Sequence, residues 1–350
     1  MKVIHIESGL GNQMLSYCEY LAMKYANPND DIYIENVIFD IPECNDVICQ
    51  WNGFELERIF GIKAPNIKTY FNEEQWNDIL KELRESEFWL HNWNWPVAIT
   101  EAFANHGLTL FNMRGNFDTP ENWAKYHPTE KSLKKMISDT YIGYLLKKNY
   151  NKLRKDKLIA SVNNKRNLFY KSSESILTGQ YLSFSKVGND IEKIDNLIRK
   201  SFVFPPLLDK KNIETRQYLS ETNSVAIHAR RGDMLGTNAY CYKYGYFKRA
   251  VKFIKEKISN PVFVFFCDPG SVQWCKENPK IFNLDFKKDT VIFIDWNKGL
   301  DSYKDMQLMS YCKHAIITNS SFGWWGAYFI ENANKITISP DITINTKYHF

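Results

Sequence analysis

The stretch VAIHARRGD, residues 225–233, decides the fold. Residues 225–229 are apolar except for His228 and predict a buried strand. Two arginines, Arg230 and Arg231, follow that strand directly, and a glycine behind them permits a tight turn. A buried strand that ends in charged side chains is typical of a parallel sheet with a ligand site at its carboxyl edge.

The same pattern continues toward the C-terminus. Further strands are predicted at residues 262–267, 291–294, 315–318 and 335–339, and helices at residues 244–259, 271–277, 301–312 and 322–331. This alternation predicts an α/β fold with a parallel sheet covered by helices on both faces. Because parallel strands end at one edge, residues 228–233 and 319–322 should gather there with Asp268 and Asp295.

A second strand–turn–helix unit opens the chain. Residues 2–6 predict a short strand, and the turn GLGNQ at residues 9–13 leads into a helix. Met14 stands where the dinucleotide-binding fingerprint has its third glycine, so that fingerprint is incomplete. The glycines allow close backbone approach to a ligand, and we expect Asn12 and Gln13 to face a cleft between two domains.

Length and composition set the class of protein. A chain of 350 residues with an apolar fraction of 44% predicts two globular domains, with a boundary near residues 200–222. The seven cysteines show no metal-ligand spacing, and no apolar run is long enough for a signal peptide or a membrane span. We therefore expect a reduced, cytoplasmic protein without structural disulfides.

The net charge of the chain indicates which classes of molecule it binds. The net charge of +5 suits an enzyme with a phosphorylated substrate and is too weak for nucleic acid. The predicted helix at residues 144–158 is rich in lysine. It is either a solvated face or a docking surface for anionic lipid at the inner membrane, and the sequence leaves both open.

The arginine pair has a functional and a structural interpretation. An arginine forms bidentate, charge-assisted hydrogen bonds to phosphate, so Arg230 is predicted to hold a diphosphate leaving group. In the alternative, the arginines are surface residues that pair with Asp233. Because neighbouring side chains of a strand point to opposite faces, one arginine, Arg231, is expected to serve structure.

The loop TNSSFGWWG, residues 318–326, is a second candidate anion site. It lies between a predicted strand and a helix, where backbone N–H groups and the helix dipole favour an anion, and Ser320 and Ser321 add hydroxyl donors. In the alternative, a serine there is an ordinary helix cap. Trp324 and Trp325 are expected to pack in the core.

Asp305 and the histidines complete the candidates. The Asp305 carboxylate has the acceptors to bind the N1–H and N2–H₂ edge of guanine, or it simply complements a helix dipole. His228 and His314 are scattered, and no metal-ligand spacing occurs. We predict a metal-independent enzyme in which the arginines replace a divalent cation.

Together these motifs resemble the bacterial α-1,2-fucosyltransferases of glycosyltransferase family 11. The matching segments occur in the family's order: GLGNQM at 9–14, FELERIF at 54–60, IHARRGD at 227–233, WCK at 274–276, DMQLMSYC at 305–312 and NSSFGWWG at 319–326. The H-x-R-R-x-D element is also similar to one in α-1,6- and protein O-fucosyltransferases.

The resemblance implies a GT-B-like α/β fold, with two Rossmann-like domains facing a cleft and a parallel sheet in the C-terminal domain. Residues 1–205 would form the acceptor-side domain and residues 206–350 the GDP-fucose-binding domain. The implied reaction inverts GDP-β-L-fucose onto the 2-hydroxyl of a terminal galactose, in surface polysaccharide or O-antigen synthesis. It needs no metal or other cofactor, and the galactose-containing acceptor is either free or lipid-linked.

The resemblance also assigns residues. Donor contacts fall on Gly11, His228, Arg230, Arg231, Asp268, Asp305, Asn319, Ser320, Ser321 and Phe322, and catalytic roles on Arg230, Asp233 and Asn12. Arg230 would bind the β-phosphate, and Asn12 would lie near the reacting hydroxyl. The general base stays open between Asp233, Glu7 and a mechanism with only weak base assistance.

Two other functions remain open on the sequence. One is a fucosyltransferase of different regiochemistry, such as α-1,6. The other is a carbohydrate-binding protein without catalysis, for which the aromatic content of 15% is the only argument.

Overall fold

A computed structural model describes residues 1–45, 52–91, 95–112, 137, 140–178, 189–232 and 235–340. The chain divides into two compact units, one of Met1–Asp139 with Leu153–Val203 and one of Thr140–Lys152 with Phe204–Phe350. Each unit is described by itself. The predicted domain limits, 1–205 and 206–350, remain predictions about where the chain folds independently.

The first unit is built on a parallel sheet with the strand order β2-β1-β4-β3. Its strands are β1 Lys2–His5, β2 Ile32–Glu35, β3 Phe111–Asn112 and β4 Ile176–Thr178. The predicted opening strand and the helix after the glycine turn, α1 (Leu10–Ala26), are both present. β4 had no sequence prediction, because three apolar or β-branched residues are too few to show a period.

Short helices complete the first unit: α3 Glu55–Phe60, α4 Glu73–Ser86, α5 Phe88–His91, α6 Trp95–Asn105 and α10 Asn189–Ser201, with 3₁₀ turns at Val37–Asp40, Pro42–Cys44 and Ile67–Tyr70. The N-cap of α4 is Asn72, whose side chain forms a capping box with Gln75. Apolar side chains of α4 and α6, including Ile79 and Phe103, pack with Val3 of β1 in one core. That core fixes β1, after which the chain continues to the glycine-rich segment at residues 9–13.

The second unit contains the predicted C-terminal sheet. Its five strands are parallel in the order β7-β6-β5-β8-β9: β5 Ser224–Ala229, β6 Val262–Cys267, β7 Thr290–Ile294, β8 His314–Ile317 and β9 Thr337–Ile338. The five strands match the five predicted ones to within two residues at most ends. β5, which carries the opening motif, lies in the centre of the sheet.

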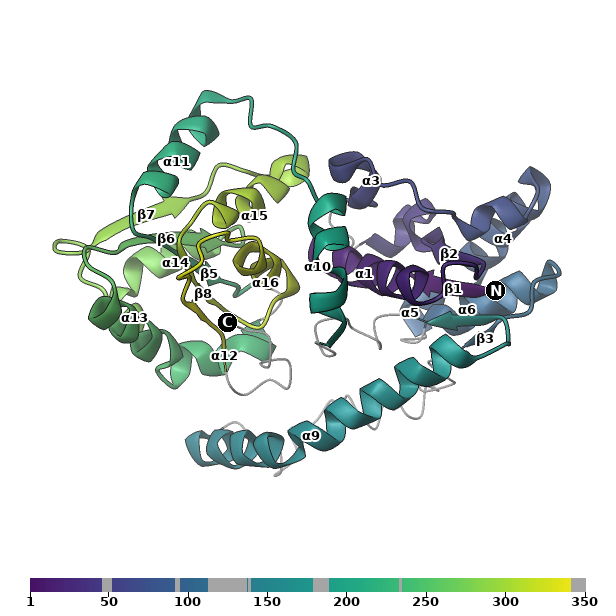
Figure 1. Ribbon diagram of the computed structural model, residues 1–350, viewed down its shortest axis with the longest axis horizontal. Helices are drawn as coiled ribbons and strands as arrows, with labels where there is room; N and C mark the ends of the chain where they lie inside the picture. The colour runs from purple at the N-terminus through teal and green to yellow at the C-terminus, as the bar shows by residue number, and fades with distance from the viewer. Residues whose placement is uncertain are drawn as a thin grey trace. The chain divides into compact units, whose positions relative to one another are not determined.

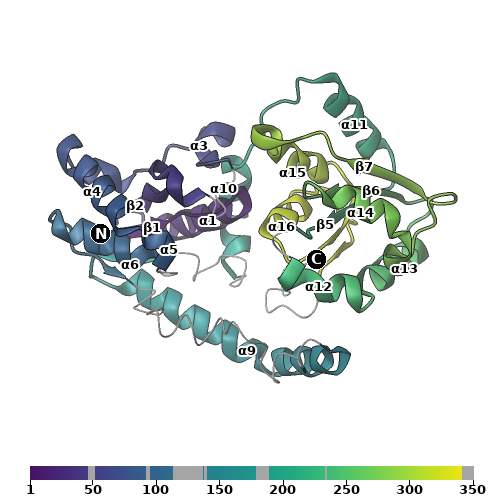
Figure 2. The same cartoon turned by 180° about the vertical axis from the view of Figure 1, so that it is seen from behind.

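Helices cover both faces of this sheet (Figure 1). Val225 and Ile227 of β5 face the core formed with α12 (Leu235–Lys243), α13 (Tyr246–Lys257) and α14 (Ser271–Glu277). The opposite face, which His228 shares, meets α16 (Ser321–Tyr328), and α16 packs beside α15 (Tyr303–Ser310), as both views show (Figure 2). The α/β prediction is confirmed, and α11 (Lys210–Glu221) and α12 are helices that it lacked.

The tryptophan pair is part of this packing. Trp325 is fully buried and Trp324 is 5% exposed, and their rings meet edge to face. The prediction that both pack in the core is confirmed.

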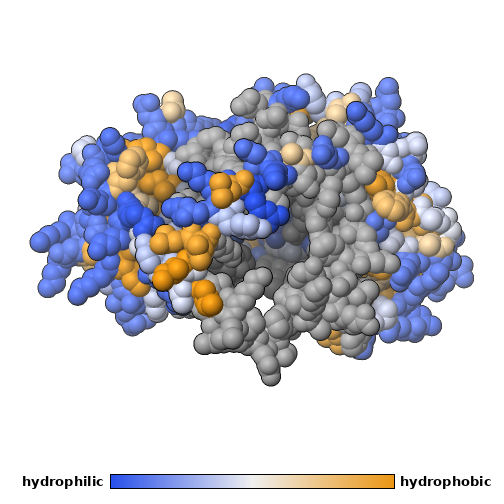
Figure 3. Space-filling model, turned by 90° about the horizontal axis from the view of Figure 1, so that it is seen from below, coloured by the Kyte–Doolittle hydropathy of each residue, from blue (hydrophilic) through white to orange (hydrophobic). Residues whose placement is uncertain are grey.

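One long helix, α9 (Tyr141–Lys171), includes the lysine-rich segment. Its first turn is held in the second unit by Tyr144, whose ring lies against those of Tyr240 and Tyr244. Figure 3 shows orange side chains gathered among blue ones on the side where the first half of α9 runs in Figure 1. Within the described ranges, no helix combines the length and apolar character that crossing a membrane requires.

Candidate functional site

The loop after β5 is held by a buried carboxylate. Asp268, at the end of β6, accepts hydrogen bonds from the backbone N–H of Arg231 (2.6 Å) and of Gly232 (2.9 Å), and from the Ser271 hydroxyl (2.5 Å). A Cβ at Gly232 would lie 3.0 Å from the same carboxylate, so this close approach favours glycine. Asp268 was predicted to bind the donor, and the structure shows it bound to the loop that carries the arginines.

The two arginines differ in their surroundings. The Arg231 guanidinium lies 3.5 Å from the centre of the Trp274 ring and 5.6 Å from that of Tyr242, which is cation–π stacking. Arg230 is fixed through its backbone, since its carbonyl accepts hydrogen bonds from the Tyr242 hydroxyl (3.0 Å) and the Asn238 amide (3.3 Å). The stacking orients the Arg231 guanidinium, whose buried Nε has no hydrogen-bond partner among the described residues. Its structural role and its donor contact therefore both remain predictions.

A threonine and an asparagine join this loop to the end of β8. The Thr318 hydroxyl donates to the carbonyl of His228 and accepts from the N–H of Arg230, both at 3.3 Å. The buried Asn238 donates to the Arg230 carbonyl and accepts from the N–H of Asn319 at 3.1 Å. The structure therefore brings together the two loops that the sequence proposed as anion sites.

The helix α16 begins at the second loop. Ser320 is its N-cap residue, yet the Ser320 side chain makes no capping hydrogen bond. The first N–H groups of a helix have no acceptor inside it, and the helix dipole makes this end positive. The interpretation of Ser320 as an ordinary cap does not hold for its hydroxyl, and the end of α16 keeps the features of an anion site.

His228 lies directly under this helix end. Its ring is 5.8 Å from the Phe322 ring and stacked on it, and a Cβ at Gly323 would overlap the imidazole. His228 is 4% exposed, and its Nδ1 has no hydrogen-bond partner among the described residues. Burial, and then the positive charge of Arg230, lower the pKa of His228 to about 3, so the ring is neutral.

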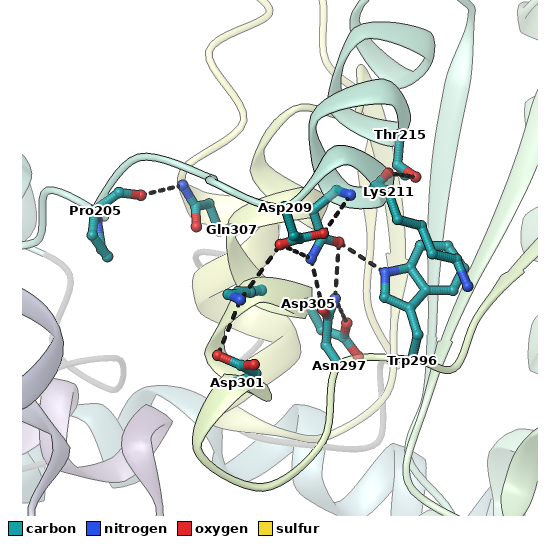
Figure 4. A network of polar contacts seen from close by, with 11 residues as sticks. Pro205, Asp209, Lys211, Thr215, Trp296, Asn297, Asp301, Asp305 and Gln307 are labelled. Atoms are coloured by element: carbon teal, nitrogen blue, oxygen red, sulfur yellow. Dashed lines mark hydrogen bonds and ion pairs between the residues drawn. The ribbon is translucent and has the colours of Figure 1, made fainter.

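Asp305 lies in the first turn of α15, in a separate network (Figure 4). Its Oδ1 accepts a hydrogen bond of 2.8 Å from the Asn297 amide. Burial raises the pKa of Asp305 to about 7 in spite of that bond, and the charge of Asp295 raises it further. Asp305 lies in the first turn of α15, so its roles as a guanine contact and as a partner of the helix dipole both remain predictions.

Asn212 organises the network from the start of α11. The side chain of buried Asn212 and that of half-buried Asn297 exchange two amide hydrogen bonds, of 2.8 and 3.2 Å. The Asn212 oxygen also accepts from the Trp296 indole N–H at 2.9 Å, and its amide donates to Asp209. The carboxylate of Asp305 is thus oriented through Asn297 by a residue 93 positions earlier in the chain.

The glycine-rich segment of the first unit, predicted as a turn at residues 9–13, is the start of a helix, because α1 begins at Leu10 with Gly9 as its N-cap residue. The N–H groups of Asn12 and Gln13 both bond to the carbonyl of Gly9, and Gly11 is buried in this first turn of α1. The side chain of Gln13 was expected to face a cleft between two domains, and this expectation is wrong. Its side chain is fully buried, and it donates to Ser8 and Gly53 and accepts from the N–H of Glu55.

Glu7 is part of a buried ionic cluster. His5 contacts Glu35 through Nδ1 and Glu7 through Nε2, the latter at 3.2 Å. Burial alone would lower the pKa of His5, but the charges and hydrogen bonds of Glu35 and Glu7 raise it to about 9. The cluster therefore holds an imidazolium between two carboxylates.

Several residues that shape the site carried no sequence signal. Asn212, Asn238 and Asn297 lie in segments without a motif, and only their partners in space reveal their roles. Trp274 lies in a motif, but its contact with Arg231 was not predicted. Asp233, predicted to be catalytic, lies outside the described residues, which also contain no cluster of three or more His, Cys, Asp or Glu able to hold a metal ion.

Comparison with protein families decides the chain's affiliation. The family described as "Glycosyl transferase family 11" matches residues 123–349, well over half of the chain. The chain belongs to this family. The matched segment contains three of the motifs described above, at residues 227–233, 305–312 and 319–326. They overlap β5, α15 and α16, respectively.

Named relatives agree with family 11 membership. An Escherichia coli α-1,2-colitosyltransferase is 37% identical over 147 residues, 39% of this chain and 47% of that protein. The E. coli O-antigen biosynthesis glycosyltransferase WbnK is 26% identical over 61% of this chain and 68% of its own length. A galactoside α-(1,2)-fucosyltransferase 1 from Ateles belzebuth is 31% identical over 30% of this chain and 28% of that protein. The chain thus spans about half of the first relative and less than a third of the last.

Solved structures with a similar chain path include that of NodZ α-1,6-fucosyltransferase with GDP. It aligns over 93% of this family 11 chain and 90% of its own, with a TM-score of 0.42 and 11% identity. At this TM-score the likeness says nothing about the site.

Proposed function

We propose that this chain transfers L-fucose from GDP-β-L-fucose to the 2-hydroxyl of a terminal galactose, with inversion and without a metal or other cofactor. Its setting would be the synthesis of surface polysaccharide or O-antigen. Family membership and the α-1,2 linkage in the names of two relatives support the proposal. The observation that carries it is the unpartnered Nδ1 of buried His228 beneath the two joined loops.

The diphosphate is the part of the donor that these loops suit. Negative charge builds on it as the sugar leaves, so fixed positive charge there stabilises the transition state more than the ground state. In this proposal Arg230 and the N-terminal end of α16, with Ser320, Ser321 and Phe322, hold the diphosphate and the fucose. Arg231 and Asp268 keep Arg230 in place through the stacking and the hydrogen bonds described above.

His228 would bind the donor without moving a proton. With a pKa of about 3 it stays neutral at physiological pH, so it is a poor general base and cannot act as an imidazolium acid. Its free Nδ1 needs a hydrogen-bond partner, because an unsatisfied buried polar atom is costly. If the bound sugar nucleotide forms a hydrogen bond with Nδ1, this unfavourable free energy is removed and binding is strengthened by the same amount.

Asp305 would read guanine. Two donors, N1–H and N2–H₂, face a carboxylate best when it is ionised. A raised pKa of about 7 means that the buried surroundings of Asp305 disfavour that charge, which is a common property of binding and catalytic carboxyls. Asn297 and Asn212 would hold the carboxylate in one orientation.

Two residues are proposed to act on the acceptor sugar. We assign Asn12 to the neighbourhood of the reacting hydroxyl and Asp233 to the role of base. The other candidate base, Glu7, already accepts from the charged His5, and a neighbouring cation makes a carboxylate a weaker base.

Colitose is a second candidate for the transferred sugar. The relative named α-1,2-colitosyltransferase has the highest identity among those described above, 37% over 147 residues. Rates with nucleotide-activated colitose and with GDP-fucose, measured side by side at equal concentration, separate the two donors.

The deciding experiment measures GDP release and product structure. The chain is incubated with GDP-fucose and a β-galactoside in EDTA, and NMR identifies the new linkage. We expect an α-1,2-fucoside, with turnover unaffected by EDTA. Arg230→Ala should lower kcat/KM at least 100-fold, about 3 kcal/mol, as loss of one oxyanion donor does. The control is Arg216→Ala, which removes an arginine whose guanidinium lies 4.8 Å from the centre of the Tyr311 ring in the same unit.

Other outcomes favour the alternatives. An α-1,6 or other linkage would keep the donor site and reject the proposed regiochemistry. Galactoside binding without nucleotide binding would indicate a carbohydrate-binding protein. Full activity in Arg230→Ala would overturn the central assignment.

A further inference from the structure

The first half of α9 presents an apolar stripe to solvent. Ile142, Leu146, Tyr150 and Leu153 follow one another at spacings of four, four and three residues, which places them on one helix face. They are 67%, 61%, 55% and 82% exposed, and Leu145 beside them is 38% exposed. A continuous exposed apolar surface of this kind marks a place that meets a partner or a membrane.

The stripe is not the face by which the helix is attached. Tyr144, on the other side of the same turns, is 6% exposed, and its ring lies 4.9 Å from that of Tyr244 and 6.1 Å from that of Tyr240. Those two tyrosines belong to the α12 region of the second unit. Tyr144 therefore anchors α9, and the apolar stripe points away from the anchor.

Basic residues border the stripe. Residues 141–157 contain six of the chain's 45 basic residues and one of its 40 acidic residues, so the rest of the chain carries 39 of each. The whole net charge of +5 therefore resides in these 17 residues. Lys152, Arg154 and Lys157, next to the apolar positions, are exposed, and Figure 3 shows apolar and polar side chains intermixed on this side.

We propose that residues 141–157 form an interfacial helix that docks on a bilayer containing anionic lipid. The apolar side chains would enter the boundary between headgroups and acyl chains, the lysines would remain among the headgroups, and Tyr150 would lie at the boundary. A second copy of the chain fits this face less well, because it would bring two segments of the same positive charge together. The inference goes beyond the transfer reaction and does not depend on it.

Vesicle flotation tests the inference with the full chain. One set of vesicles is pure phosphatidylcholine, and the other is an equal mixture of phosphatidylcholine and phosphatidylglycerol. We expect the protein to float with the mixed vesicles, to stay in solution with the neutral ones, and to be released by high salt.

Paired variants separate this face from general surface effects. Leu153→Asp should abolish flotation, whereas Leu208→Asp should not, although the two leucines are 82% and 84% exposed. Replacing Lys152 and Lys157 together by glutamine should weaken binding about 25-fold, about fivefold for each charge removed. Lys252→Gln, at a lysine whose side chain is 73% exposed in another helix, is its control. Circular dichroism and thermal unfolding show whether each variant is folded.

Three results would overturn the inference. The first is no flotation, or equal flotation with neutral and anionic vesicles. The second is flotation of Leu153→Asp at the wild-type level. The third is a dimer in solution that Leu153→Asp dissociates while flotation persists, which would assign this face to a second copy.

Discussion

Two buried histidines near the ends of parallel strands have opposite charge states. His5 ends β1 in the first unit and His228 is the next-to-last residue of β5 in the second, and they are 0% and 4% exposed. The pKa of His5 is raised to about 9 and that of His228 is lowered to about 3. Burial lowers the pKa of both histidines, so their neighbours account for the difference between the two values. Two carboxylates raise the pKa of His5, whereas the guanidinium of Arg230 lowers that of His228 further.

The two histidines also differ in whether their ring nitrogens have hydrogen-bond partners. Both ring nitrogens of His5 are bonded to glutamates, so His5 completes a closed ionic cluster. His228 keeps Nδ1 without a partner at a position where two loops and a helix end converge. A buried polar atom without a partner is unfavourable unless a ligand supplies one, so we propose that His5 stabilises the fold and that His228 contributes to ligand binding.

Replacing each histidine by glutamine tests this directly and should have the largest effect. His5→Gln leaves Glu7 and Glu35 without their cation, and breaking a buried ion pair in this way costs about 3–5 kcal/mol of unfolding free energy. His228→Gln should cost about 1 kcal/mol but weaken GDP binding. Urea unfolding and calorimetric GDP titration measure both. Equal destabilisation with intact GDP binding in His228→Gln would break the comparison.

Asp305→Asn should give the next largest effect, with opposite signs on binding and stability. Loss of a charged acceptor should weaken GDP binding about 10- to 100-fold. A folded pKa of about 7, above the ordinary 3.8, means that the carboxyl favours folding below pH 3.8 and opposes it as pH rises through 7. The variant should therefore unfold at a higher temperature than the wild type at pH 8.

The guanine contact has its own control. Inosine diphosphate lacks the N2 amino group, so the wild type should prefer GDP and Asp305→Asn should bind both alike. An unchanged preference in the variant would remove Asp305 from the base site.

Gly323→Ala should have a smaller effect, confined to the His228 site. The added methyl group would lie 2.8 Å from Cγ of His228, and overpacking of this kind costs about 1–3 kcal/mol. GDP affinity should fall with it. Adding His228→Ala should restore most of the lost stability, because the methyl then has space. Additive losses in the double variant would show that the strain lies elsewhere.

The pH dependence of stability should show the smallest effect, with opposite signs for the two histidines. The raised pKa of His5 stabilises the fold fully below pH 6.5, and this contribution is lost as pH rises through 9. The lowered pKa of His228 stabilises the fold fully above pH 6.5, and this contribution is lost as pH falls toward 3. Thermal unfolding from pH 4 to 9.5 should lose the alkaline slope in His5→Gln and the acid slope in His228→Gln. Unchanged slopes would contradict these assignments.

Local sequence patterns determined the elements of the second unit. Apolar runs such as residues 262–267 predict buried strands, because a short apolar segment bounded by proline, glycine and aspartate can be recognised from a few neighbouring residues. The parallel arrangement then follows from the alternation with helices, and it places His228 and Phe322 at one edge. The motifs shared with the family, at residues 227–233 and 319–326, contain the same two residues.

Tertiary structure alone decided which side chain does what. Arg230 and Arg231 are chemically identical and adjacent, and Trp274 lies 3.5 Å from the guanidinium of Arg231, a contact that the sequence did not predict. Asn212 lies 85 positions before Asn297, and Asn238 lies 81 positions before Asn319. The charge state of His5 likewise depends on Glu35, 30 positions later, and that of His228 depends first on burial. Burial and electrostatic energies follow distance in space, which a local sequence pattern does not contain.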